Sequence, residues 1–409
     1  MSFNIALSGL NAAQTSLDVA ANNIANANTT GFKQSRAEFS DVYATAFGNM
    51  DSLGGSVGVK VAAVSPLFSQ GNINTTGNAL DLAVNGDGFF VMSDQGSNVY
   101  TRNGSFSVDR DGYVVNTLGQ RLQAYPALDT QGTSFNTAAM GDLQLGVSST
   151  APNASTAAQI SMNLDAGAAQ LGAGTIDPAD PSTYNYSTSV TLYDSLGQSH
   201  TGSMYFRNVD SATRNWDVSL VMDGDTTQTA SVQNLTFDNL GQLTSAQPLN
   251  FGSYDPGNGA AAMDVAFDFT GSSQFGSSFA VNALNQDGYS TGRLSGLNVD
   301  ANGVVQARFS NGQSAALGKV ALANFVNPQG LIPLGDSNFG AGYQAGDRRL
   351  GEPGAGNFGV LQSGALEASN VEITQELVNL ISAQRSFQAN SQVITTSNNI
   401  TQTAMNMVR

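Results

Sequence analysis

Apolar residues recur at every seventh position at both ends of this chain, which constrains those ends to long, packed helices. Near the amino terminus the repeat begins at Phe3, and an alanine follows each of its members three places later. Residues in this a/d spacing form the seam along which helices pack, and alanine at d lets a neighbouring helix approach closely. The members of the repeat are Phe3, Leu10, Leu17 and Ile24, followed by Ala6, Ala13, Ala20 and Ala27.

A second repeat predicts a longer helix at the carboxyl end. This helix is expected from residue 371 to residue 407, which is about 55 Å at 1.5 Å per residue. The pattern alone fits two cases equally: helices packed on their own domain, and helices packed on other copies of the chain. The members of the repeat are Leu366, Ile373, Leu380, Phe387 and Ile394, with Leu377 and Ile381 beside them.

The middle of the chain has the pattern of β-structure. Short apolar runs are separated by Gly, Asn and Asp, which is typical of β-hairpins. One turn unit, Asx-x-Leu-Gly-Gln, recurs without a fixed period, so it predicts related hairpins rather than a solenoid. Its copies are residues 116–120, 194–198 and 238–242.

A chain of 409 residues is long enough for several domains, since single cores usually stop growing near about 250 to 300 residues. We expect a mixed fold in which long terminal α-helices form a coiled-coil-like inner layer. Two mainly β domains accompany them, with the outer one inserted into the inner one. A Gly-rich connector is expected at 47–58. The expected domains are 1–71 with 361–409 (terminal helical domain and connector), 72–147 with 285–360 (inner discontinuous β domain) and 148–284 (inserted outer β domain).

Composition excludes several kinds of site. The chain has no cysteine, which rules out disulfides and thiolate metal sites, and a single histidine, His200, which rules out a His-His metal cluster. We expect His200 to be an exposed bystander rather than a general base, and we predict no enzyme and no catalytic, cofactor-binding or metal-binding residues. The formal net charge of −16 disfavours nucleic acid and anionic membranes, which need clustered Lys and Arg. Charged residues make up only 11% of the chain, which suits a surface that neighbours cover.

Three motifs superficially suggest ligand sites, but each is better explained as a turn. Residues 354–359 match G-x-G-x-x-G, yet Glu352-Pro353 precedes them and no βαβ unit surrounds them, so we predict a bend. Residues 109–112 lack the further oxygen ligands of a calcium loop and predict a hairpin turn. Residues 86–90 predict a turn that enters a strand.

The two ends together resemble a known family. Ser8-Gly-Leu-Asn-Ala-Ala13 and Asn22-Asn-Ile-Ala-Asn-Ala-Asn-Thr-Thr-Gly-Phe-Lys33 are similar to the amino-terminal signature of flagellar rod and hook proteins. Leu366-Glu-Ala-Ser-Asn-Val371 and Ala383-Gln-Arg-Ser-Phe-Gln-Ala-Asn390 resemble the matching carboxyl-terminal signature. Three further stretches resemble the shared β domain of the family. They are Asn85-Gly-Asp-Gly-Phe-Phe90, Thr101-Arg-Asn-Gly-Ser-Phe106 and Phe325-Val-Asn-Pro-Gln-Gly-Leu331.

The resemblance implies a structural role. Hook members fit better than distal rod members because the segment 148–284 adds a β domain, and filament-junction members rank third. A secreted β-rich adhesin or enzyme is the alternative from a different class. The implied role is that of a subunit which self-assembles into a curved hollow tube, a universal joint that transmits motor torque from rod to filament. The implied partners are other copies of the chain, the distal rod protein, the hook cap protein, the hook-filament junction protein and the flagellar type III export apparatus.

The resemblance also implies a place and an interface. The place is the extracellular hook of the bacterial flagellum, and the interface lies on the terminal helices. Because MSFNIALSGL has no basic n-region and no long apolar h-region, we expect export without a cleavable signal peptide. No run approaches the roughly 18 apolar residues of a membrane span, so we expect no membrane insertion. The candidate self-assembly residues are Phe3, Leu10, Leu17, Ile24, Ile373, Leu377, Leu380, Phe387 and Ile394.

Overall fold

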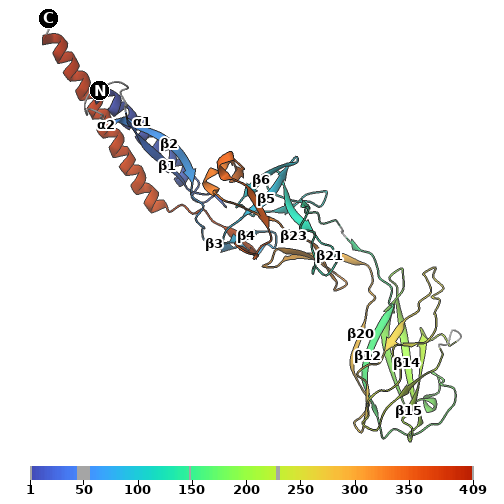
Figure 1. The fold of residues 1–409 in the computed structure, drawn as a ribbon. Helices are drawn as coiled ribbons and strands as arrows, with labels where there is room; N and C mark the ends of the chain where they lie inside the picture. Colours follow the sequence, from blue (N-terminus) through green and yellow to red (C-terminus); the bar gives the residue numbers. More distant parts are fainter. Residues whose placement is uncertain (1, 44–55, 147–148, 227–230, 408–409) are drawn as a thin grey trace. The chain divides into compact units, whose positions relative to one another are not determined.

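The structure is a computed structural model that describes residues 2–43, 56–146, 149–226 and 231–407. The chain forms two compact units, coloured along the sequence in Figure 1. Unit 1 consists of Met1–Gly146, Gly296–Arg308 and Ser314–Arg409, and unit 2 of Val147–Ser295 and Phe309–Gln313. Mainly β units with a helix at each end of the chain confirm the coarse fold prediction, while the division into three domains stays a prediction. Most of the expected connector at 47–58 lies outside the described residues.

The two terminal helices belong to unit 1 and lie side by side (Figure 1). They are α1 (Ser2–Ala25) and α2 (Ile373–Met407), so α2 begins within two residues of the predicted start. An antiparallel hairpin of β1 (Ser35–Tyr43) and β2 (Ser56–Pro66) packs on α1. Both predicted terminal helices are therefore confirmed.

Two short ladders join the beginning of the chain to its end. The first pairs β3 (Ile73–Thr75) with β29 (Ala365–Glu367), and the second pairs β4 (Leu82–Asn85) with β28 (Val360–Ser363). Both ladders are antiparallel. They bring the start of the carboxyl-terminal family motif beside the strands that lead into the β part of unit 1.

The β part of unit 1 is built around a strand that is buried on both faces. This strand is β5 (Phe89–Asp94); Phe90 and Met92 enter one apolar cluster and Phe89 and Val91 a second one, as alternation in a strand requires. The other strands here are β6 (Ser97–Thr101), β7 (Ser107–Val108), β8 (Val114–Val115), β9 (Arg121–Pro126), β10 (Gly141–Asp142), β22 (Val304–Phe309), β23 (Ser314–Val320), β24 (Leu322–Phe325), β25 (Ile332–Gly335), β26 (Asn338–Gly340) and β27 (Arg348–Gly351), with short helices η2 (Pro328–Gly330) and η3 (Tyr343–Ala345).

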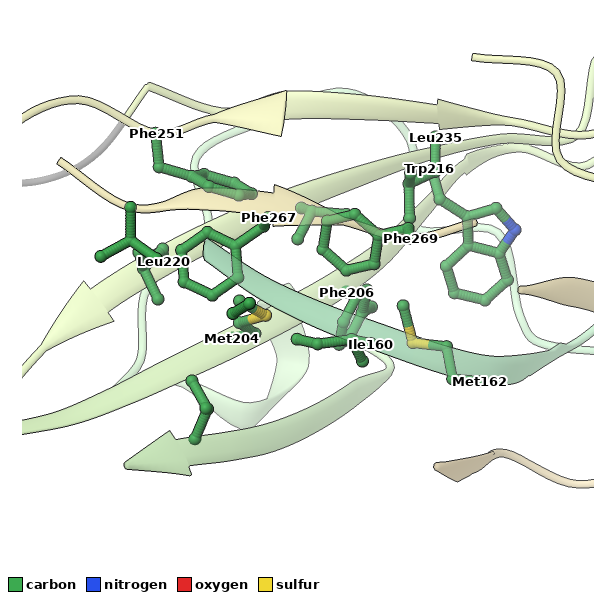
Figure 2. Close-up of a cluster of buried hydrophobic side chains, with 14 of the residues drawn as sticks. Ile160, Met162, Met204, Phe206, Trp216, Leu220, Leu235, Phe251, Phe267 and Phe269 are labelled. Carbon is green, nitrogen blue, oxygen red and sulfur yellow. The ribbon is translucent and has the colours of Figure 1, made fainter. Parts of the chain in front are cut away.

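Unit 2 consists of two sheets that share one apolar core. Figure 2 shows this core, where Ile160, Met204, Phe206 and Trp216 are fully buried together. One sheet contains β12 (Ala157–Asp165), β17 (Leu249–Asn250), β18 (Ala266–Asp268), β19 (Ser273–Phe275) and β20 (Ala280–Gln286). The other has the order β13 (Tyr186–Tyr193), β14 (Ser199–Asp210), β15 (Asn215–Met222) and β16 (Gln233–Thr236). The remaining elements are η1 (Pro181–Thr183), β11 (Ser149–Thr150) and β21 (Gly292–Val299), which pairs with β11 and continues into unit 1.

The predicted turns are confirmed. In the turns headed by Asn116, Asp194 and Asp238, the side chain of that first residue accepts hydrogen bonds from the backbone N–H groups two and four residues later. Residues 109–112 join β7 to β8, and residues 86–88 join β4 to β5. Residues 354–359 form a bend that Gly354 closes by donating to the carbonyl of Gly359. None of these three segments opens a helix.

Candidate functional site

The seam of α1 is closely packed. Ala6, Ala13 and Ala20 are only 3–5% exposed, because α1 packs along α2 and against the β1–β2 hairpin. The larger residues of the same repeat, Leu10, Leu17 and Ile24, are half-buried. Small residues at d therefore do what the repeat predicts, which is to let the neighbouring elements approach the helix backbone.

The heptad residues of α2 also form a seam, which faces into unit 1. Leu380, Phe387 and Ile394 are half-buried, and Ala383 between them is 7% exposed. Asn390 lies directly against Gly9 of α1: a Cβ on Gly9 would come within 2.8 Å of the Asn390 amide. Gly9 thus leaves room for the Asn390 side chain between the two helices.

The other predicted residues lie outside this seam. Phe3, Ile373 and Leu377 are 42–46% exposed in the single chain. Further large apolar side chains are exposed around them: Ile5, Leu7, Val378, Ile381, Val393, Ile400 and Met405 on the helices, and Phe39, Val61 and Val64 on the hairpin. The predicted set thus divides into half-buried residues, which face neighbouring elements of unit 1, and residues that are exposed in the single chain. Contact with another copy stays a prediction for all nine.

Beside the helices lies a buried ionic cluster that unites the family motifs. Lys33 Nζ is 2.6 Å from Glu367 Oε1, and an Arg102 guanidinium nitrogen is 3.3 Å from the other carboxylate oxygen. All three side chains are at most 3% exposed. Lys33 also donates to the carbonyl of Ser69, and Glu367 accepts from the backbone N–H of Gly71. The amino-terminal motif, the carboxyl-terminal motif and the β domain therefore meet at one carboxylate.

The charges in this cluster depend on one another. Burial lowers the pKa of Lys33 from its usual 10.5; the charge of Glu367 opposes this, and that of Arg102 adds to it. Burial likewise lowers the pKa of Arg102, against the charges of Glu367 and Asp87. Glu367 is thus the carboxylate that pairs with both buried cations, Lys33 and Arg102. Removing one partner of a buried pair leaves an uncompensated charge, so the cluster fixes how the chain segments meet.

Amide side chains of the same motifs form a second polar cluster at the start of α2. Asn23 exchanges two hydrogen bonds with the backbone of Ser35 and donates to Glu376 at 3.3 Å. Gln34 donates to the other Glu376 oxygen at 2.6 Å, and its own N–H is accepted by Asn370. Glu376 is 2% exposed and lies in the first turn of α2, where the positive end of the helix dipole favours a carboxylate.

The predicted exposure of His200 is wrong. His200 is 4% exposed in unit 2, with Nδ1 2.6 Å from Asp223 and Nε2 3.2 Å from Asp194. Burial alone would lower the pKa of His200, but these hydrogen bonds and charges raise it above 6.5. The prediction failed because only the fold brings the end of β15 to the 194–198 turn. Both ring nitrogens contact carboxylates, so the imidazole links the end of β15 to the 194–198 turn.

Sequence reasoning missed the ionic and amide clusters, although a signal was present. Only 11% of the residues are charged, and Lys33, Arg102 and Glu367 each stand inside one of the quoted family motifs. A charge kept inside a motif of a charge-poor chain marks a candidate buried pair. Along the described ranges of the chain, no helix is apolar over the length that crossing a membrane requires.

Family models match this chain along most of its length. "Flagella basal body rod protein" matches residues 3–33 and "Flagellar hook protein FlgE/F/G D1 domain" residues 83–161. "Flagellar basal body protein FlaE D2 domain" matches residues 163–289, and "Flagellar basal body rod FlgEFG protein C-terminal" residues 362–407. The first and last of these contain the α1 seam and the whole of α2.

Curated relatives match from end to end. The flagellar hook protein FlgE of Salmonella typhimurium is 38% identical over 413 residues, and that of Escherichia coli K12 is 38% identical over 411 residues; each match covers 100% of both chains. Among solved structures, the Helicobacter pylori flagellar hook protein FlgE2 has a TM-score of 0.53 at 16% identity, covering 72% of this chain and 100% of that one, which is a likeness of fold. The chain therefore belongs to the flagellar hook protein family.

Proposed function

We propose that this chain is the structural subunit of the bacterial flagellar hook. Copies assemble into a curved hollow tube that acts as a universal joint and transmits motor torque from rod to filament. The observation that carries the proposal is the row of large apolar side chains left exposed on both terminal helices, including Phe3, Ile373 and Leu377. Exposed apolar residues gathered on paired helices mark a protein interface, and a homopolymer supplies the partner from the same chain.

The nine candidate residues have two different roles in assembly. The half-buried set on α1 and α2 holds the helix pair together, and the exposed set joins that pair to the pairs of neighbouring copies. Helices packed in this way form a coiled-coil-like inner layer of the tube. The β part of unit 1 forms the next layer. Unit 2 forms the outer layer, and its larger segment, Val147–Ser295, interrupts the sequence of unit 1 between Gly146 and Gly296.

A joint that bends as it turns needs two kinds of contact. Contacts in the inner layer persist through a rotation, because they bury apolar side chains and form the most stable part of the tube. Contacts in the outer layers exchange partners, and the charge-poor surface suits this, since few buried ion pairs would lock one geometry. The subunit is thus a structural part and carries out no catalysis.

The family also suggests what the tube meets at its ends. The first subunits join the distal rod protein, and the last join the hook-filament junction protein. Growth proceeds under the hook cap protein from subunits that the flagellar type III apparatus exports without cleaving a signal. These partners are proposed from family membership.

Electron microscopy of the purified chain tests the function. The full chain, concentrated in a salt that strengthens apolar burial, should form tubes visible by negative stain. A chain that ends at residue 372 lacks α2 and should remain as discrete particles under the same conditions. Discrete particles from the full chain at every concentration would contradict the proposal.

A further inference from the structure

The two terminal helices carry very few charges. Asp18 is the only charged residue of α1, and Glu376 and Arg385 are the only charged residues of α2. Glu376 is buried and its carboxylate accepts hydrogen bonds from amide side chains. Asp18 and Arg385 are both exposed. Each helix therefore presents one exposed charge, and the two charges are opposite in sign.

Both exposed charges face away from the seam between the helices. Asp18 lies two residues before Ala20, and Arg385 lies two residues after Ala383, and these alanines are buried in the seam. Two residues rotate an α-helix by about 200°, so each charge lies on the side of its helix opposite to the buried alanine. Among the residues that the structure describes, Arg385 has no hydrogen-bond or ion-pair partner, and Asp18 accepts only from the Gln14 amide, at 2.9 Å.

The two charges also lie at nearly the same height along the helices. Asn23 donates to Glu376, and Gly9 lies against Asn390, so α1 runs back 14 residues where α2 runs forward 14 residues. The negative charge of α1 is five residues from the first of these contacts, and the positive charge of α2 is nine residues from it. The difference of four residues is about 6 Å at 1.5 Å per residue.

Exposed apolar side chains share the helix faces that carry these charges. Ile381 and Val378 lie one and two turns before Arg385, and they are 47% and 57% exposed. Leu7 lies three turns before Asp18 and is 42% exposed. A neighbour that buries these apolar side chains also takes the two charges out of water. A buried charge without a partner is strongly disfavoured, so each of the two needs an opposite charge on the neighbour.

We propose that Arg385 of one copy of this chain pairs with Asp18 of a neighbouring copy. The inference rests on the proposed self-assembly and names a contact within it. Charge complementarity selects a second copy as the partner, because every copy carries one charge of each sign on otherwise uncharged exposed helix faces. The contact joins two different patches, so it is heterologous and repeats into an open polymer. The guanidinium can form two parallel hydrogen bonds with a carboxylate, which holds one geometry and suits an inner contact that persists.

Charge reversal in two separate chains tests the contact. Asp18→Arg and Arg385→Asp should each raise the critical concentration for tube formation about 30-fold or more, as expected when a buried charge loses its partner. An equimolar mixture of the two variants should assemble close to the wild-type critical concentration, because each variant then meets the opposite charge on the other. Mixing can rescue only a contact between copies. A mixture that assembles no better than either variant alone would overturn the inference.

Glu372→Arg is the matched control, since Glu372 is exposed just before α2 and the substitution changes the net charge as much as Asp18→Arg does. It should leave the critical concentration unchanged, and mixing it with Arg385→Asp should give no rescue. Rescue by this control would mean that general attraction between chains, or Glu372 itself, is responsible, and the assignment to Asp18 would be wrong.

The free chains supply a second readout. Because both charges are exposed and unpaired with each other in the single chain, Asp18→Arg and Arg385→Asp should melt at the wild-type temperature. A lowered melting temperature in either variant would place the partner of that charge within the chain and would contradict the inference. Wild-type tubes without rescue in the mixture overturn this contact alone, whereas a wild-type chain that forms no tubes overturns the proposed function as well.

Discussion

Lys33 and Glu367 lie 334 positions apart in the sequence, yet their charged atoms are 2.6 Å apart and neither side chain is exposed. Lys33 follows the turn that ends the amino-terminal motif, and Glu367 ends β29 just before α2. Arg102 brings the β part of unit 1 to the same carboxylate. This relationship ties the segments beside both terminal helices to the β framework.

Glu367→Gln should strongly destabilise unit 1. The substitution removes the carboxylate that pairs with both buried cations, and breaking a buried pair in this way costs about 3 to 5 kcal/mol. Calorimetry on the free chain should show the unit 1 transition at a lower temperature. The fluorescence of Trp216, the single tryptophan, reports on unit 2 and should not change.

The control for that substitution is Glu38→Gln. Glu38 pairs with Arg36 at 2.9 Å, but both side chains are exposed, so the pair is worth at most about 1 kcal/mol. If Glu367→Gln is no more costly than Glu38→Gln, the buried cluster does not hold the segments together.

Gly31→Ala should also destabilise unit 1. Gly31 has φ of +68°, and a Cβ there would lie 2.4 Å from the backbone nitrogen of Asn103, which cannot move without displacing the β framework. We expect a loss of about 3 kcal/mol or more in the free energy of unfolding, measured by urea. Gly77→Ala is the control, since Gly77 has φ of +80° but no neighbour within 4 Å and should cost only about 1 kcal/mol. Equal losses at both positions would mean that steric contact with Asn103 is unimportant.

Unit 2 should be most stable in mildly acidic solution. The raised pKa of His200 means that the folded unit holds this proton more tightly than the unfolded chain does, so its contribution is complete below pH 6.5 and is lost as pH rises through the folded value. For Asp194, burial raises the pKa, but donors from Asn258, Gln198 and His200 outweigh it and lower the pKa to about 2. That contribution is present above pH 3.8 and is lost as pH falls.

Urea unfolding followed by Trp216 fluorescence over a pH series measures this dependence. Stability should reach its maximum between pH 3.8 and 6.5 and decline on either side. His200→Gln keeps a buried polar side chain but cannot titrate, so it should remove most of the decline above pH 6.5. A decline of the same size in the variant would show that another group is responsible.

Local features of this fold could be predicted from the sequence, because short-range chemistry determines them. The 371–407 helix follows from its repeat, and the turn headed by Asp238 follows from an acceptor side chain and a glycine three residues later. The two-sided burial of β5 could not be predicted, since it depends on which strands return to cover Phe89 and Phe90. The same limit explains the error at His200, whose second carboxylate comes from Asp223, 23 residues away.

The candidate interface shows most clearly what could not be predicted from the sequence. A heptad repeat states which residues form a seam but not whether the partner helix belongs to the same chain. In the structure, Leu380 and Phe387 are half-buried where α2 meets α1, whereas Ile373 and Leu377 of the same prediction are exposed. Exposure in the free chain separates the two roles, and that quantity depends on tertiary structure alone.

A pair of aspartate substitutions on α2 can assign these roles. Leu377→Asp places a carboxylate on a side chain that is 45% exposed, so it stays hydrated in the free chain and should not change amide-exchange protection of α2. In the tube the same carboxylate would be buried without a partner, so polymerisation should be lost. Leu380→Asp adds the same charge one turn later on the half-buried seam, and it should reduce protection of α2 in the free chain as well as assembly. Because the two variants carry the same net charge, repulsion between subunits cannot explain a difference in exchange. Tubes from Leu377→Asp at the wild-type critical concentration would remove Leu377 from the interface, and unchanged exchange in Leu380→Asp would mean that α1 and α2 are not paired before assembly.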